Sequence, residues 1–154
     1  TILFDHAALN RRLTVDLAAG AGFLMVETLV FGRAAMGEVL HEVHLRDRIR
    51  INRAGAPLYL DGIALAGDVQ RHLARPAIAG GAGAVATLVF VGVEAEAQLR
   101  PLRALLPETA AASLLPGGVL VARLLASDSF ELRRAVIPAL MLLNDGQMPL
   151  NWRL

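Results

Sequence analysis

The sequence has neither cysteine nor lysine among its 154 residues. The absence of cysteine excludes a disulfide framework, a thiolate zinc site and a cysteine nucleophile. All 15 basic residues are therefore arginine, and 14 acidic residues bring the net charge to +1. Because there is no excess of positive charge to displace phosphate counterions, we expect no nucleic-acid partner.

Aromatic residues are also few, at 5%, and no apolar run is long enough to cross a bilayer. The longest apolar stretches, Phe23–Val26 and Val85–Val93, are well short of the roughly 20 residues of a transmembrane helix. No secretory signal pattern opens the chain, so we expect a soluble, cytoplasmic protein with no membrane partner. The chain begins at Thr1 rather than methionine, already within a strand-like segment, and we expect it to be a fragment.

Apolar residues make up 55% of the chain and charged residues 19%, which is typical of a folded domain. Alternating polarity or buried apolar runs predict strands at residues 13–17, 23–31, 43–51, 58–60, 84–93 and 119–125. The first four follow one another closely, so we expect them to form an antiparallel meander. A hairpin loop is predicted at residues 52–57 between the third and fourth strands.

Helical signals are concentrated late in the chain. Residues 94–106 have helical spacing, with glutamates in the first turn and arginines later. A second helix can be capped by Ser127 or Asp128, and Asp128 has capping-box spacing with Glu131. Its stop signal is Asn144–Gly146. A short helix within residues 67–75 ends before Pro76, and residues 107–118 are expected to be a linker. The predicted fold class is mainly β with two C-terminal helices.

Six segments share their sequence and order with a known family: Thr1–Asp5, Leu29–Glu38, Arg46–Arg48, Gly67–Asp68, Leu73–Pro76 and Pro149–Arg153. Together they resemble the second half of the UreD (UreH) family of urease accessory proteins. The GRxxxGE pattern from Gly32 to Glu38 is the most specific of them. The resemblance implies that residues 1–154 are the C-terminal part of a single UreD-like domain made of stacked, β-helix-like sheets. It also implies that the N-terminal half of the family is absent.

The same resemblance implies a scaffold rather than an enzyme. Members of the family bind apo-urease and the partner UreF, and UreF brings in the GTPase UreG. Together these proteins deliver nickel to the urease active site. By this resemblance no cofactor is tightly bound, and nickel contacts the protein only transiently.

The densest group of metal-ligating residue types comprises Glu38, His41, Glu42, His44 and Asp47. Imidazole and carboxylate groups are the side chains left to bind nickel when thiolate is absent. On a strand His41 and His44 point to opposite faces, so only Glu42 and His44 converge. With Asp5 added, the predicted weak nickel contacts are Asp5, Glu38, Glu42 and His44. A solvated strand face that binds no metal is the alternative reading of the same residues.

A function from another class stays open, namely a metal-assisted hydrolase that uses His41, His44 and Asp47. Other catalytic patterns are absent: no serine lies in a Gly-x-Ser-x-Gly elbow, and the glycine-rich Gly80–Gly83 lacks the lysine of a phosphate-binding loop. Asp47 lies on the apolar face of its strand, where a carboxylate needs a partner.

Candidate partner-binding residues are of the types that anchor protein interfaces, arginine and aromatic residues among them. They are Arg33, Glu38, Trp152 and Arg153.

Overall fold

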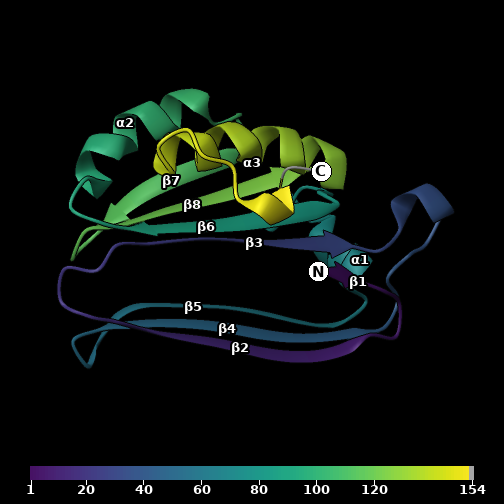
Figure 1. The fold of residues 1–154 in the computed structure, drawn as a ribbon. Helices are drawn as coiled ribbons and strands as arrows, with labels where there is room; N and C mark the ends of the chain where they lie inside the picture. The colour runs from purple at the N-terminus through teal and green to yellow at the C-terminus, as the bar shows by residue number, and fades with distance from the viewer. Residues whose placement is uncertain (153–154) are drawn as a thin grey trace. The chain divides into compact units, whose positions relative to one another are not determined.

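The computed structural model describes residues 1–152, which form a mainly β protein, as the sequence predicts. The chain divides into two compact units. The first comprises residues 1–21 and 29–83, and the second comprises residues 22–28 and the chain from residue 84 onwards. Strand β3 (Phe23–Phe31) passes from the second unit into the first, and each unit is described in turn (Figure 1).

The first unit contains a three-stranded sheet in the order β2-β4-β5. Its strands are β2 (Ala8–Leu17), β4 (Val43–Arg53) and β5 (Ala56–Gly67). Strands β4 and β5 form a hairpin closed by Ala54 and Gly55, whose φ angles are 49° and 78°. Two successive positive φ angles are typical of the tight turns that match the twist of paired strands. The loop predicted at residues 52–57 is therefore shorter, and β5 extends well beyond the predicted 58–60.

The predicted antiparallel meander is wrong. Strand β2 pairs with β4 in parallel, with Ala8 opposite His44 and Leu17 opposite Arg53. Strand β3 lies in the other sheet, where its last residues pair in parallel with β1 (Ile2–Leu3).

Two short helical elements complete the first unit. The 3-10 helix η1 (Ala34–Met36) lies in the loop before β4, and α1 (Val69–Leu73) follows β5. The side chain of Asp68 caps α1 by accepting a hydrogen bond from the Arg71 backbone, which confirms the short predicted helix. The large side chains buried in this unit include Leu3, Leu29, Leu40, Val43, Ile51 and Val69.

The second unit is built on β6 (Ala84–Val91), β8 (Val119–Ala126) and β7 (Ala110–Leu115), which pair antiparallel in that order. Strand β3 lies on the other side of β6, giving the sheet order β1-β3-β6-β8-β7. Helices α2 (Ala95–Leu105) and α3 (Ser129–Leu143) cover one face of these strands (Figure 1).

The predicted linker at residues 107–118 is wrong, because it contains β7. Its proline and glycines, Pro116–Gly118, form the hairpin turn into β8 rather than a longer connection.

Helix α3 begins and ends where the sequence predicts. The Asp128 carboxylate accepts hydrogen bonds of 2.9 Å from the backbone amides of Phe130 and Glu131. Leu132, Val136 and Leu140 form its buried stripe. The segment Leu150–Trp152 forms a 3-10 turn (η2). Within residues 1–152, no helix is both long and apolar enough to cross a membrane.

Candidate functional site

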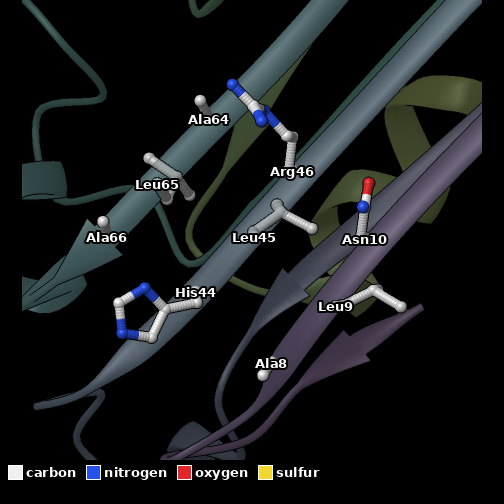
Figure 2. A pocket seen from close by; sticks show the side chains of 9 residues that line it. All are labelled: Ala8, Leu9, Asn10, His44, Leu45, Arg46, Ala64, Leu65 and Ala66. Atoms are coloured by element: carbon white, nitrogen blue, oxygen red, sulfur yellow. The ribbon is translucent and has the colours of Figure 1, made fainter.

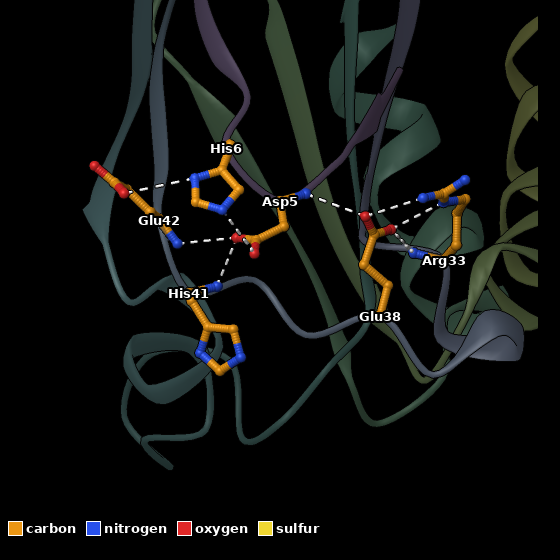
Figure 3. Close-up of polar contacts among 6 residues, drawn as sticks. All are labelled: Asp5, His6, Arg33, Glu38, His41 and Glu42. Atoms are coloured by element: carbon orange, nitrogen blue, oxygen red, sulfur yellow. Dashed lines mark hydrogen bonds and ion pairs between the residues drawn. The ribbon is translucent and has the colours of Figure 1, made fainter.

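Asp5 follows β1 and ties the beginning of the chain to the segment before β4. Its Oδ1 atom accepts hydrogen bonds from the backbone amides of His41, at 2.8 Å, and Glu42, at 2.9 Å (Figure 3). The bond from the Glu42 amide is the largest cause that lowers the pKa of Asp5 below its ordinary value. The carboxylate therefore stays ionised and holds two backbone amides that would otherwise lack a partner.

Glu38 closes the loop that contains the GRxxxGE pattern. Its Oε2 accepts from the backbone amide of Arg33 at 2.9 Å and from Arg33 Nε at 3.0 Å, and its Oε1 accepts from Arg33 Nη2 at 3.2 Å. The Asp5 amide donates to Oε1 at 3.2 Å (Figure 3). These bonds, led by those from the Arg33 side chain, lower the pKa of Glu38 to about 2. Arg33 also lies over the Phe4 ring, 4.8 Å from its centroid.

The predicted pair Arg33 and Glu38 is thus brought together, and its two members bind each other. The loop between them turns at Gly37, whose φ is 69°, a conformation that favours glycine. The spacing of the GRxxxGE pattern is explained by this closed loop. A partner-binding role for the two residues stays a prediction.

The predicted nickel ligands are divided between two places. Asp5, Glu38 and Glu42 lie where the segment after β1 meets the segment before β4 (Figure 3). There His6 Nδ1 lies 3.5 Å from Glu42 Oε2, and His6 Nε2 lies 3.6 Å from Asp5 Oδ2. His44 lies instead on the exposed face of β4. Across the described part of the chain, no three histidine, aspartate or glutamate residues are grouped so that they could hold a metal ion.

Asp47 lies on the buried face of β4 and is only 3% exposed. As predicted, it has a partner: Arg11 Nε donates to Oδ1 at 3.0 Å and Arg11 Nη2 donates to Oδ2 at 2.7 Å. Parallel pairing places Arg11 directly opposite Asp47. Sequence reasoning missed Arg11 because the pairing of β2 with β4 was not predicted. His44 faces the other way, so the two residues cannot act together on one substrate.

The exposed face of β4 borders an open depression of about 450 Å³ (Figure 2). The depression is lined by three neighbouring residues from each strand of the sheet: Ala8, Leu9, Asn10, His44, Leu45, Arg46, Ala64, Leu65 and Ala66. A second depression, of about 630 Å³, lies further along the same sheet and is lined in part by Arg12, Arg48 and Arg50.

Trp152 is partly buried against α3. The guanidinium of Arg133 lies 5.4 Å from the centroid of the indole ring and donates a hydrogen bond to the Trp152 carbonyl oxygen. Arg153, predicted together with Trp152, lies outside the described residues. A role of either residue in partner binding stays a prediction.

Comparisons with known proteins identify the family. A family model described as UreD urease accessory protein matches residues 1–153. Proteins named "Urease accessory protein UreD" from Roseobacter denitrificans and Ruegeria pomeroyi are 53% and 52% identical to the chain. The alignments cover 100% and 99% of this chain but 56% and 59% of the two relatives, so the chain spans little more than half their length. A relative of the same name from Methylobacterium sp. is 45% identical over 99% of the chain. The chain belongs to the UreD urease accessory protein family.

Proposed function

We propose that the chain serves urease maturation as part of a non-catalytic accessory scaffold. The observation that carries this proposal is the family match, which extends over residues 1–153. The relatives are named as accessory proteins and not as an enzyme. Because the chain spans only part of their length, the proposed role is that of the whole protein.

In this proposal the protein binds UreF, reaches UreG through UreF, and docks on apo-urease in the cytoplasm. Nickel is the cargo, held transiently and handed on, and no cofactor is bound tightly. The family's stacked, β-helix-like sheets would form the scaffold. The exposed His6 and Glu42 support weak rather than tight metal contact, because their neighbours Asp5 and Glu38 are already engaged by protein donors.

The hydrolase alternative has no support in the geometry. His44 and Asp47 lie on opposite faces of β4, and Asp47 is engaged by Arg11 on both carboxylate oxygens. A general base must reach the proton that it abstracts, and this carboxylate faces the protein interior.

Co-purification tests the scaffold proposal. Tagged UreF and tagged apo-urease are each incubated with the purified protein, and we expect the protein to be retained by both. Nickel-dependent activation of urease should then require it. Failure to associate with either partner, for a protein that is folded by circular dichroism, would overturn the proposed function.

Trp152 gives a variant for the same experiment. Trp152→Ala is expected to weaken retention if this residue anchors a partner, because buried aromatic side chains dominate interface energies. Arg100→Ala, which removes an exposed side chain from α2, is the matched control and should leave retention unchanged. Equal retention of both variants would remove Trp152 from the interface.

A further inference from the structure

Four arginines stand on the outer face of the β2-β4-β5 sheet and are called the arginine strip: Arg12, Arg46, Arg48 and Arg50. Three of them alternate along β4 with buried residues, so they share the exposed face. Arg12 joins them from β2, because the parallel register places it directly opposite Arg48. The strip therefore concentrates positive charge on one side of one sheet, in a chain whose net charge is only +1.

The strip is not neutralised by the protein itself. Within residues 1–152, the side chains of Arg12, Arg46 and Arg48 form no hydrogen bond or ion pair. Arg50 Nε donates to Asn52 Oδ1 at 2.8 Å, and Asn52 in turn donates to Asp16 Oδ1 at 2.7 Å. At one end the strip thus reaches the Asp16 carboxylate through an intervening amide. The Asp61 carboxylate lines the same depression as Arg48 and Arg50, but within residues 1–152 it forms no ion pair with Arg12, Arg46 or Arg48.

Small residues flank the strip and leave its guanidinium groups accessible. Ala64 and Gly62 of β5 lie opposite Arg46 and Arg48 in the antiparallel register. A Cβ atom at Gly62 would lie 3.2 Å from the carbonyl oxygen of Asp47, closer than most such contacts. The four arginines are divided between the two open depressions, of about 450 and 630 Å³: Arg46 lines the first, and the other three line the second (Figure 2 shows the first).

We propose that the arginine strip binds an extended, acidic segment of a partner protein, with carboxylates at alternate positions. Alternate residues of a strand are about 6.6–6.8 Å apart, and the same spacing holds in an extended partner. A row of guanidinium groups can therefore meet a row of carboxylates one to one. Each planar guanidinium offers two parallel N–H donors to a carboxylate, a geometry that lysine cannot provide.

Arg11 shows this recognition within the same sheet, since it binds both oxygens of Asp47. The arginine strip presents the same chemical group on the opposite face, where no carboxylate of residues 1–152 is paired with the side chain of Arg46 or Arg48. The inference rests on the proposed scaffold function and deepens it, because it names the chemistry of a segment that the scaffold would hold.

A protein segment fits this face better than a nucleic acid. The near-zero net charge provides no wider field to attract a phosphate backbone. Phenylalanine, tyrosine and tryptophan are absent from the outward positions of β2, β4 and β5, so this part of the described chain offers no such ring for base stacking.

The test uses two labelled peptides and fluorescence anisotropy. In one peptide glutamate and threonine alternate, and in the other the same residues are arranged in two blocks. We expect the alternating peptide to bind more tightly, with affinity that falls as salt increases. The double variant Arg46→Thr/Arg48→Thr should bind it at least about tenfold more weakly, since it loses the charged hydrogen bonds of two guanidinium groups.

Two matched variants keep the test specific. Arg75→Ala/Arg100→Ala removes the same amount of charge from exposed positions outside the strip and should change binding less than twofold. Arg46→Lys/Arg48→Lys keeps the charge but not the planar fork, and should bind with intermediate affinity. Equal binding by the lysine variant and the unmodified protein would overturn the one-to-one bidentate geometry.

Two further outcomes would overturn the proposed site, and a third would overturn only the scaffold function. Unchanged peptide binding by Arg46→Thr/Arg48→Thr would remove the strip from the site. Tighter binding of a single-stranded oligonucleotide than of the alternating peptide, lost in the same variant, would assign the face to nucleic acid. Loss of co-purification with UreF and urease while peptide binding persists would instead overturn the scaffold function and leave the acidic-segment site standing.

Discussion

The two faces of β4 use charged side chains in opposite ways. On the inner face Asp47 is 3% exposed, lies in line with Leu45 and Ile49, and is bound at both oxygens by Arg11. On the outer face Arg46 and Arg48 are exposed and have no partner within residues 1–152. Asp47 is therefore buried and paired, whereas its two neighbours in the sequence are exposed and available to bind a partner.

The difference follows from desolvation. A charge removed from water is stable only when a partner replaces its hydration, so the inner carboxylate must be paired. A charge that stays in water needs no partner and remains available to bind one. We therefore expect the inner face to govern stability and the outer face to govern binding.

The largest effect is expected for Asp47→Ala on the inner face. Removing the carboxylate leaves the partly buried Arg11 guanidinium without its main partner, and the free energy of unfolding should fall by about 3–5 kcal/mol. Urea denaturation followed by circular dichroism measures the change. Arg48→Thr, one residue away on the outer face, is the control. A loss for Asp47→Ala no greater than that of the control would refute the distinction between the faces.

A double variant separates the pair from its individual charges. Arg11→Met/Asp47→Leu replaces both ions with apolar side chains and should destabilise less than Asp47→Ala alone, because no unpaired charge remains. The free-energy losses of the single variants Arg11→Met and Asp47→Leu are measured alongside. If their sum equals the loss of the double variant, Arg11 and Asp47 do not act as a pair.

The next effect in size concerns acid stability and the carboxylate of Glu38. Its folded pKa of about 2 lies below its ordinary value of 4.5. A lowered pKa means that the folded state favours the ionised form, so the stabilisation is fully present above pH 4.5. It is lost as the pH falls from there towards 2. Urea midpoints measured across this range should decline less steeply for Glu38→Gln than for the unmodified protein.

The exposed Glu108 gives the control for this measurement. Glu108→Gln should leave the acid limb of the stability curve unchanged, because its side chain is exposed on a loop of the second unit. Parallel curves for Glu38→Gln and the unmodified protein would show that the Arg33–Glu38 loop contributes no pH dependence.

The strands and late helices could be predicted from the sequence because their signals are local. Strand β3 has the predicted bounds, Phe23–Phe31, and α3 is capped by Asp128, one of the two predicted candidates with Ser127. The alternation in β4 also identified Asp47 as a carboxylate in need of a partner. Such features depend on residues close together in the chain, where periodicity and capping rules apply.

Partners distant in sequence could not be predicted. Arg11 binds Asp47 across 36 positions, and Asp5 accepts from the His41 amide across the same separation. Both contacts depend on strand pairing, and the parallel pairing of β2 with β4 has no local signal. The sequence identified Glu38 as one of a group of metal-ligating residue types. That Glu38 closes a loop by binding Arg33 could be seen only in the structure. Asp5 accepts its hydrogen bonds from backbone amides, and a contact of this kind leaves no pattern of side-chain types in the sequence.

A smaller effect is expected in the second unit, where Asp128 caps α3. Like Asp5, it is a carboxylate whose Oδ1 accepts from two backbone amides. Asp128→Ala should lower the melting temperature by less than Asp47→Ala, since water can replace an exposed cap. Asp128→Asn, which keeps an acceptor oxygen, should recover most of the loss. Equal losses for alanine and asparagine would show that capping by this oxygen is not the cause.

The smallest effect on stability is expected on the outer face, and its sign is informative. Arg48 lies opposite Arg12 and two positions from Arg46 and Arg50. It therefore experiences repulsion from like charges, and its side chain has no attractive partner among the described residues. Arg48→Thr keeps a residue suited to a strand and should leave the free energy of unfolding unchanged or raise it by up to about 0.5 kcal/mol. The gain should disappear at high salt, where screening removes the repulsion. A fall of more than about 1 kcal/mol in the free energy of unfolding would mean that Arg48 stabilises the fold, contrary to the proposed role in binding alone. The same variant therefore separates the two faces of β4: it should lose affinity for the acidic peptide while its fold is as stable as before.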